Sequence, residues 1–406
     1  MPATTTGRIV RSFAAWIALP LILVVGCGDA PNGPPVGTAV PTTVASETLD
    51  LASFTAALQD YWVRHAGEAG LTFSPLPAAR IQPIDGQEVI CDGQPVAAQD
   101  VADNAIALTC AEGPAVVWDP ALIDDLTQKF GPTAPAMVLA HEWGHVLDAA
   151  TNLGFEGVVA EQFADCIAGS FTAGAMAEGI APYLSRAALD ATVGATVDFS
   201  DPVGTDAEEE DAHGLGFDRI RALQEGYDLG AAKCVGYRTS APPLTEVKFA
   251  KEDKKTNGNL PYDELLPLAM KEATSFAASS DIPFAAAAVG ITSMSTKELK
   301  ALHKRIGDGA PLTVLLLDSA ATAQEAEGRD PSQDGERLQQ ACYAGAFLGW
   351  ASRGESDELA LSAGDVDESL ATLTTLNASS VPGFVFELVS QMRAGFTQGN
   401  GACARR

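Results

Sequence analysis

The chain has 406 residues, 47% of them hydrophobic, which is enough for more than one domain with its own core. Its formal net charge is −28, from 25 Lys and Arg against 53 Asp and Glu. Such an excess of acid excludes a nucleic-acid partner, because binding to phosphates needs basic side chains. It indicates a well-hydrated, self-repelling surface.

The N-terminal segment has the features of a targeting signal. Two Arg precede an apolar run from Phe13 to Val25, which is too short to span a bilayer comfortably. The small residues directly before Cys27 resemble the lipobox of bacterial lipoproteins. That resemblance implies a signal peptide over residues 1–26 and a lipid on Cys27; an ordinary signal peptide or membrane anchor is the alternative. Residues 27–47, rich in Pro, Gly and Thr, are predicted to be a flexible tether.

Six further Cys predict disulfide bonds. An even number of Cys in an exported protein implies disulfides, although six Cys allow 15 pairings. Order along the chain favours three neighbouring pairs: Cys91–Cys110, Cys166–Cys234 and Cys342–Cys403.

Residues 48–240 form the first predicted domain, which opens with a helix from Thr48 to Ala66. Between residues 71 and 115, several Pro and Gly and two Cys predict loops and short strands. The apolar segment Ala115–Asp119 predicts a strand, which Pro120 ends. An edge strand beside a catalytic site would pair with an extended peptide substrate, whereas an ordinary core strand would not. The sequence allows both interpretations.

The segment Met137–Ala149 reads MVLAHEWGHVLDA and is the central motif of the chain. Its pattern predicts a helix on which His141 and His145 lie one turn apart on one face. Two imidazoles at this spacing can bind one metal ion, and Glu142 lies beside the first. This is the HExxH pattern, in which two His hold Zn²⁺ and the Glu is the general base toward a zinc-activated water. Gly144 faces away from the ligands and leaves room for a neighbouring helix.

A second helix, predicted from Val158 to Gly169, supplies the third ligand. Catalytic zinc has three protein ligands and one position open to water. Glu161 is the predicted ligand because its carboxylate has the longer reach. Asp165, one turn further on the same face, is then placed to hydrogen-bond a ligand His. The alternative is that Asp165 binds the metal and Glu161 does not.

Three strings carry a family resemblance: AHEWGH, EQFADCIAG and HGLGFDRIRALQEGYDLGAAKC. Together they resemble the neutral zinc metallopeptidase family of bacteria, over about a third of the chain. The resemblance implies a zincin-like domain in which His141, His145 and Glu161 bind one zinc ion. It also implies that Glu142 is the base.

The region Leu184–Gly214 contains an acidic loop, including Glu208–Asp211, which is predicted to be a solvated surface. His213 lies just ahead of the last helix of the family pattern, Phe217–Tyr227. It could hydrogen-bond the tetrahedral oxyanion or the leaving amine of a peptide. Alternatively, it is a structural residue at the entry to that helix. One of the two Arg in the helix could pair with the acidic surface.

Residues 241–406 repeat the spacing of the first domain. Pro135 and Cys166 are 31 residues apart, as are Pro311 and Cys342. The two segments between them align without a gap. A second correspondence pairs Gly226, Tyr227, Gly230 and Cys234 with Gly395, Phe396, Gly399 and Cys403. We interpret this half as a degenerate copy.

The predicted metal ligands are absent from the copy. The residues facing His141, Glu142, His145 and Glu161 are Leu317, Asp318, Ala321 and Arg337. Taken together, the predicted elements give a fold class that is α+β and mainly helical. It consists of a zincin-like domain with a small edge sheet, followed by a helical degenerate duplicate.

The predicted function is a zinc-dependent peptidase that hydrolyses peptide or protein substrates outside the cytoplasm. Its lipid would attach it to the bacterial cell membrane. The alternative is a non-catalytic surface lipoprotein or binding module derived from a peptidase. A structural zinc in such a module would need a fourth protein ligand, for which His213 is the candidate.

Overall fold

The computed structural model describes residues 49–84, 88–181, 183–201, 203, 205–207, 212–245, 258–279, 289–362, 364–377 and 380–404. The predicted signal peptide, the tether, Cys27 and the acidic run Glu208–Asp211 lie outside these residues. Within them the chain is mainly helical with a small sheet, which confirms the predicted class. None of the described helices is both long and apolar enough to cross a membrane.

The first half of the described chain, residues 49–245, contains the strands and the predicted metal ligands. Its elements are α1 (Leu51–His65), β1 (Ile81–Pro83), β2 (Ile90–Cys91), β3 (Gln94–Pro95), β4 (Ala105–Leu108), β5 (Ala115–Trp118), α2 (Pro120–Phe130), α3 (Thr133–Thr151), α4 (Gly157–Glu178), α5 (Arg186–Asp198), α6 (Gly216–Leu229) and α7 (Ala231–Val235).

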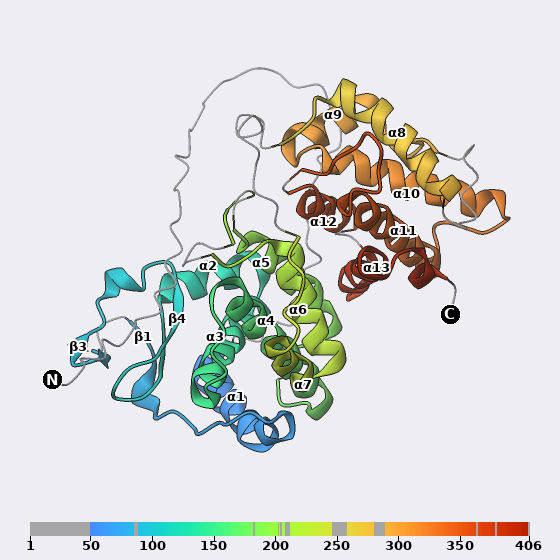
Figure 1. Ribbon diagram of the computed structural model, residues 1–406. Coiled ribbons are helices and arrows are strands. Elements are labelled where there is room, and N and C mark those ends of the chain that lie inside the picture. The colour runs from blue at the N-terminus through green and yellow to red at the C-terminus, as the bar shows by residue number, and fades with distance from the viewer. Residues whose placement is uncertain are drawn as a thin grey trace, which may run out of the picture.

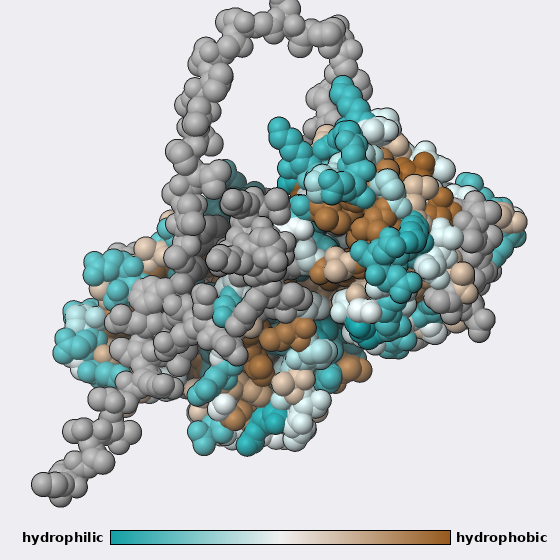
Figure 2. Space-filling view, turned by 45° about the horizontal axis from the view of Figure 1, so that its top comes forward, coloured by the Kyte–Doolittle hydropathy of each residue, from teal (hydrophilic) through white to brown (hydrophobic). Residues whose placement is uncertain are grey.

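The second half, residues 258–404, is helical throughout its regular elements. These are α8 (Tyr262–Ser279), α9 (Thr296–Arg305), α10 (Gly309–Ala326), α11 (Asp334–Ser352), α12 (Asp365–Leu376) and α13 (Phe384–Gln398). Figure 1 shows the two halves as two helical groups, the first coloured from blue to yellow-green and the second from yellow to red. On the face drawn in Figure 2, hydrophilic residues surround smaller hydrophobic areas on both halves, as is usual for a protein surface.

The three-stranded sheet has the order β1-β5-β4, so the predicted strand at Ala115 is central. It pairs in parallel with β1 and antiparallel with β4, and all four of its residues are buried. The edge-strand interpretation of this segment is therefore wrong and the core-strand alternative is correct. Among the described strands, β4 is the edge strand that lies against α3.

The region between Leu184 and Gly214 also contains a helix, α5, that was not predicted from the sequence. Ser185 caps it by accepting a hydrogen bond from the backbone N–H of Ala188. Leu189 and Val193, one turn apart, are both buried in the core. The helix forms because this apolar pair packs inward. It was not predicted because the acidic residues further along the segment obscure this apolar spacing.

All three predicted disulfides are present, each with an S–S distance of 2.04–2.05 Å. Cys91–Cys110 closes the segment of loops and short strands. Cys166–Cys234 joins α4 to α7, and Cys342–Cys403 joins α11 to the turn after α13.

Glycines set the close packing of the helices around the predicted site. A Cβ on Gly144 of α3 would lie 2.4–3.1 Å from three atoms of Ala164 in α4, so only Gly fits there. In the crossing of α4 and α6, a Cβ on Gly169 would overlap the carbonyl oxygen of Leu223. A Cβ on Gly226 would overlap that of Cys166. These contacts hold α3, α4 and α6 at the separation that the predicted ligands require.

The crossing of α11 and α13 in the second half uses glycines in the same way. A Cβ on Gly345 would overlap the carbonyl oxygen of Met392, and one on Gly395 would overlap that of Cys342. In the alignment of the two halves, Gly345 corresponds to Gly169 and Gly395 corresponds to Gly226. The repeated Gly and Cys positions therefore make the same kinds of contact in both halves.

The two halves exchange helix caps where they meet. Asp190 of α5 accepts hydrogen bonds from the backbone N–H groups of Gly383 and Phe386 at the start of α13. Reciprocally, Asp367 of α12 accepts them from Gly216 and Phe217 at the start of α6, at 2.7 and 2.8 Å. Carboxylates at helix N-termini satisfy free N–H groups and complement the helix dipole.

Aromatic pairs at the same junction are also reciprocal. The ring of Phe217 lies 5.0 Å from that of Phe396, and Tyr227 lies 5.2 Å from Phe386. In the repeat, Tyr227 corresponds to Phe396. The α6–α13 contact is therefore close to two-fold symmetric.

Replacing Gly226 by Ala should destabilise the chain by about 1–3 kcal/mol, because the new Cβ overlaps the Cys166 carbonyl. The control is Gly236→Ala, where φ is −59° and a Cβ would meet nothing within 4 Å. That change should stabilise by about 0.4–1 kcal/mol. Denaturant midpoints under non-reducing conditions measure both. Equal effects of the two changes would contradict the tight crossing of α4 and α6.

Candidate metal centre

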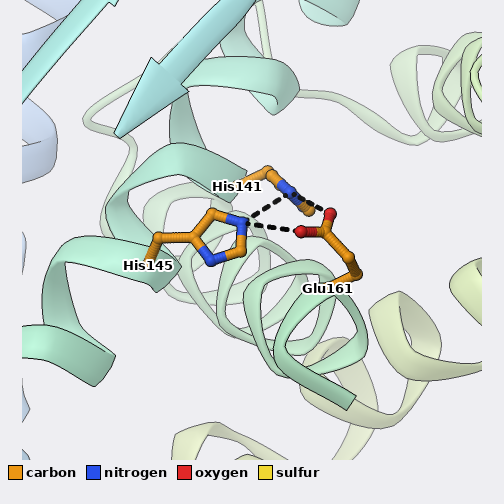
Figure 3. A group of neighbouring side chains, drawn as sticks. All are labelled: His141, His145 and Glu161. Atoms are coloured by element: carbon orange, nitrogen blue, oxygen red, sulfur yellow. Dashed lines mark hydrogen bonds and ion pairs between the residues drawn. The ribbon is translucent and has the colours of Figure 1, made fainter. Parts of the chain in front are cut away.

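α3 presents His141 and His145 toward one point, as their spacing predicts. The helix follows Gly131 and Pro132 and ends at Asn152, which adopts a left-handed conformation with φ 56°. His141 is 8% exposed, and its Nε2 lies 3.2 Å from Nε2 of His145. Figure 3 shows the two imidazoles on one helix and Glu161 facing them from the neighbouring helix.

Glu161 of α4 completes this group, which could hold a metal ion. One of its oxygens, Oε2, lies 3.2 Å from Nε2 of His141, and the other lies 3.3 Å from Nε2 of His145. Ligand atoms about 2.0–2.1 Å from a shared tetrahedral ion are separated by about 3.3 Å. The separation of the two imidazole nitrogens and the distance from each nitrogen to its nearer carboxylate oxygen match this value. One ligand atom from each of the three residues lies within 4.8 Å of the other two, so the group could hold one ion. Glu161 Oε2 is also buried, and its recorded charged neighbour is the imidazole of His141, which a shared cation would replace as the partner of this oxygen.

Asp165 lies on the other side of His141 and is not part of the group. Its Oδ1 is 2.8 Å from Nδ1 of His141, the nitrogen that faces away from Glu161. Of the two alternatives left open by the sequence, the geometry favours Glu161 as ligand and Asp165 as the residue that orients the imidazole. Such a hydrogen bond fixes the tautomer that leaves Nε2 free to bind a metal.

Arg219 of α6 supports Asp165 in turn. Its Nε and one terminal nitrogen donate to the two carboxylate oxygens at 2.9 and 3.1 Å, and its other terminal nitrogen donates to the carbonyl of Phe199. Both side chains are buried. Arg219 therefore pairs with a buried carboxylate.

The charges of the group are strongly coupled. Burial opposes the charged form of His141, but Asp165 and Glu161 outweigh it and raise the pKa of His141 to about 10. Burial alone would raise the pKa of Glu161, yet the two imidazoles hold that pKa well below the usual range. The pKa of Asp165 is also lowered, with burial opposed chiefly by Arg219. Both carboxylates are thus held ionised beside the imidazoles.

Glu142 is buried next to the group and is linked to the edge strand. Its Oε2 accepts a hydrogen bond from the backbone N–H of Ala107 in β4 at 2.7 Å. Burial raises the pKa of its carboxyl, and the charges of His141 and His145 oppose that effect. The carboxylate, the two imidazoles and the sheet edge therefore lie together.

His213 contacts Asp201. Its Nδ1 is 3.5 Å from Asp201, which also accepts the backbone N–H of His213. Among the described residues, the group at His141 contains three side chains, and His213 is not one of them. The role of His213 toward a peptide stays a prediction.

Three features of the centre were not predicted from the sequence. They are the Arg219–Asp165 pair, the Ala107 hydrogen bond to Glu142, and the cap that Asp367 places on α6. Each depends on contacts between segments far apart in the chain. Of these features, only the one with Arg219 could have been noticed in the sequence, because Arg219 lies within the third family-like string.

The chain matches no protein-family model, no curated protein and no solved structure. The resemblance to zinc metallopeptidases therefore stays a prediction from the sequence motifs.

Metal affinity should increase with pH. A raised pKa means that metal-free His141 keeps a proton up to about pH 10, and a ligand imidazole must lose that proton. The apparent affinity should increase up to about tenfold per pH unit for each proton displaced. Competition with a chromophoric chelator at pH 6, 7 and 8 measures it, and calorimetry in two buffers counts the released protons. An affinity independent of pH would contradict this protonation state.

Proposed function

We propose that this chain is an extracytoplasmic zinc peptidase. The observation that carries the proposal is the convergence of His141, His145 and Glu161. The two Nε2 atoms are 3.2 Å apart, and each lies 3.2–3.3 Å from one oxygen of Glu161. Two imidazoles and one carboxylate are a usual donor set for catalytic zinc. One zinc ion per chain is expected.

A catalytic role is favoured over a structural one by the number of ligands. Structural zinc sites are closed by four protein ligands, whereas catalytic sites have three. The described residues bring three side chains together here, and the ring of His213 faces Asp201. This weighs against the alternative of a non-catalytic lipoprotein with a structural zinc.

Each side chain at the centre then has a distinct task in peptide hydrolysis. When bound, zinc would polarise the peptide carbonyl and make water more acidic, to a pKa near 7. Glu142 would take the proton of the attacking water and pass it to the leaving amine. Asp165 keeps Nδ1 of His141 occupied, and Arg219 keeps Asp165 ionised and in position.

The edge strand β4 suggests how a substrate is held. Its residue Ala107 points its backbone N–H toward Glu142, on the side away from β5. An extended peptide that adds to this edge would place its backbone next to the general base. We therefore propose unfolded segments or peptides as the substrate class.

We further propose that the second half is a degenerate copy without a catalytic centre. The matched glycine crossings, the matched disulfides and the reciprocal caps support it. Its contribution would be to support the first half, since Asp367 caps α6, the helix that carries Arg219.

Metal analysis combined with a peptide library tests the proposed function. The purified protein should contain one zinc per chain and cleave part of the library. A chelator should stop cleavage, and added zinc should restore it. His141→Ala should lose both zinc and cleavage. A protein that binds one zinc but cleaves nothing would support the binding-module alternative instead.

A further inference from the structure

A second group of carboxylates lies in the second half, apart from the HExxH helix. Asp308 precedes α10, and Asp365 and Glu368 lie in the first turn of α12. One oxygen from each of the three lies within 4.8 Å of those of the other two. All three residues are buried, at 3%, 4% and 9% exposure.

Neutral backbone and hydroxyl groups hold these carboxylates in place. Asp308 accepts the N–H of Leu260, Glu368 accepts that of Gly309, and Asp365 accepts the N–H and the hydroxyl of Ser362. None of the ion pairs between described residues places a Lys or Arg on the three. The other polar neighbours of the three acids are the side chain of Asn259, which bonds Glu368, and His303, whose charge acts on Asp308.

One oxygen of Asp308 has no ordinary hydrogen-bond donor. Its Oδ1 is buried and accepts from no N–H or hydroxyl group, while the other oxygen of that carboxylate is bonded to Leu260. When no cation is bound, Asp308 shares a proton with the neighbouring carboxyl of Asp365. A buried acceptor without a donor costs about 1–3 kcal/mol, and more if it is charged. Oxygen atoms that share one cation would remove this cost.

The mutual repulsion of the carboxylates points the same way. Burial and the charges of Asp365 and Asp308 raise the pKa of Glu368 to about 9. The pKa of Asp365 is raised well above its usual range by burial and by Asp308. Without a cation the group would have to retain protons at neutral pH.

We propose that Asp308, Asp365 and Glu368 bind a calcium ion. All the donors are oxygens, which favours a hard cation over zinc. Three oxygens about 4.2 Å apart lie about 2.4 Å from a common centre, within the calcium range of 2.3–2.6 Å. The separations here, at most 4.8 Å, allow this arrangement. Magnesium needs a shorter, near-octahedral arrangement and keeps most of its water, which suits a buried group less well.

The site would connect the second half to the helix that supports the catalytic centre. Asp367 lies between Asp365 and Glu368 on α12 and caps α6. α6 carries Arg219, the partner of Asp165. Calcium would therefore fix the turn of α12 from which the two halves are joined.

Calcium titration of the zinc-loaded protein tests this inference. At pH 7.5 and 0.15 M salt, calorimetry should detect one saturable Ca²⁺ per chain, with a rise in melting temperature. The salt suppresses diffuse binding to the acidic surface. Glu368→Gln and Asp308→Asn should each weaken binding at least tenfold. Their melting temperatures without calcium should equal or exceed that of the parent, because repulsion is relieved.

Asp318→Asn is the matched control. Asp318 is a buried acid on α10 that accepts the N–H groups of Thr292 and Ser293, outside the group. This variant should still bind Ca²⁺. The inference would be overturned by the absence of saturable binding up to about 10 mM, by binding of Mg²⁺ alone, or by unchanged binding in Glu368→Gln. None of these results depends on peptidase activity, so they leave the proposed function to its own test.

Discussion

Glu142→Gln should lower kcat/KM for peptide hydrolysis by a factor of about 10²–10⁴, the usual contribution of a general base. Gln has the same shape and can still accept the N–H of Ala107, but it cannot take a proton from water. The ligands His141, His145 and Glu161 are unchanged, so the variant should still hold one zinc per chain. Kinetics on a peptide selected from the library and elemental analysis of the same sample measure the two quantities.

Glu178→Gln serves as the matched control for this change. Glu178 ends α4, the helix of the third ligand, but pairs with Arg64 and His65 at the surface. Its replacement should change neither zinc content nor kcat/KM. If Glu142→Gln and the parent hydrolyse the library alike, Glu142 is not the base. If Glu142→Gln also loses zinc, its role is to keep the site assembled.

The local part of the centre could be predicted from the sequence because a helix fixes the separation of its residues. Side chains four apart lie on one face, so the HExxH pattern determines how His141 and His145 meet. The helix of Glu161 begins only a few residues after the metal helix ends, so its return alongside is strongly constrained. Gly144 then allows the close contact with Ala164 that completes the group.

The supporting contacts could not be predicted because they depend on distant segments. Arg219 reaches Asp165 only through the crossing of α6 over α4, which no local pattern specifies. The strand Ala105–Leu108 is short, and its role as the sheet edge follows from pairing with β5. The helix α5 was missed because its apolar positions are few and lie beside an acidic run.

The second half shows how far a repeat can extend such predictions. The spacing of Cys342 and Cys403 predicted their disulfide, and the spacing of Gly345 and Gly395 corresponds to a crossing of the same kind as in the first half. The carboxylates at Asp308 and Glu368 have no counterpart in the first half's motif. Their proximity depends on the contact between α10 and α12, which the sequence does not specify.

Arg219→Met should destabilise the chain by about 3–5 kcal/mol, because it leaves the buried carboxylate of Asp165 without its guanidinium partner. Methionine fills a similar volume, so the lost charge dominates the effect. Zinc affinity should also decrease by about 10–100-fold, since Asp165 would no longer be held against His141. Denaturation of the metal-free protein and a chelator competition measure the two losses separately.

The double variant Asp165→Asn with Arg219→Met separates charge from packing. It removes both buried charges. Its loss of stability should therefore be smaller than the sum of the two single losses, by about 1–3 kcal/mol. Arg221→Met is the control. Arg221 is buried on the same helix, 3.6 Å from Asp218, and does not contact Asp165 in the network described. Its loss should lower stability and leave zinc affinity unchanged. If Arg219→Met and Arg221→Met affect zinc affinity equally, Arg219 contributes only to folding. Asp165 would then orient His141 without help from Arg219.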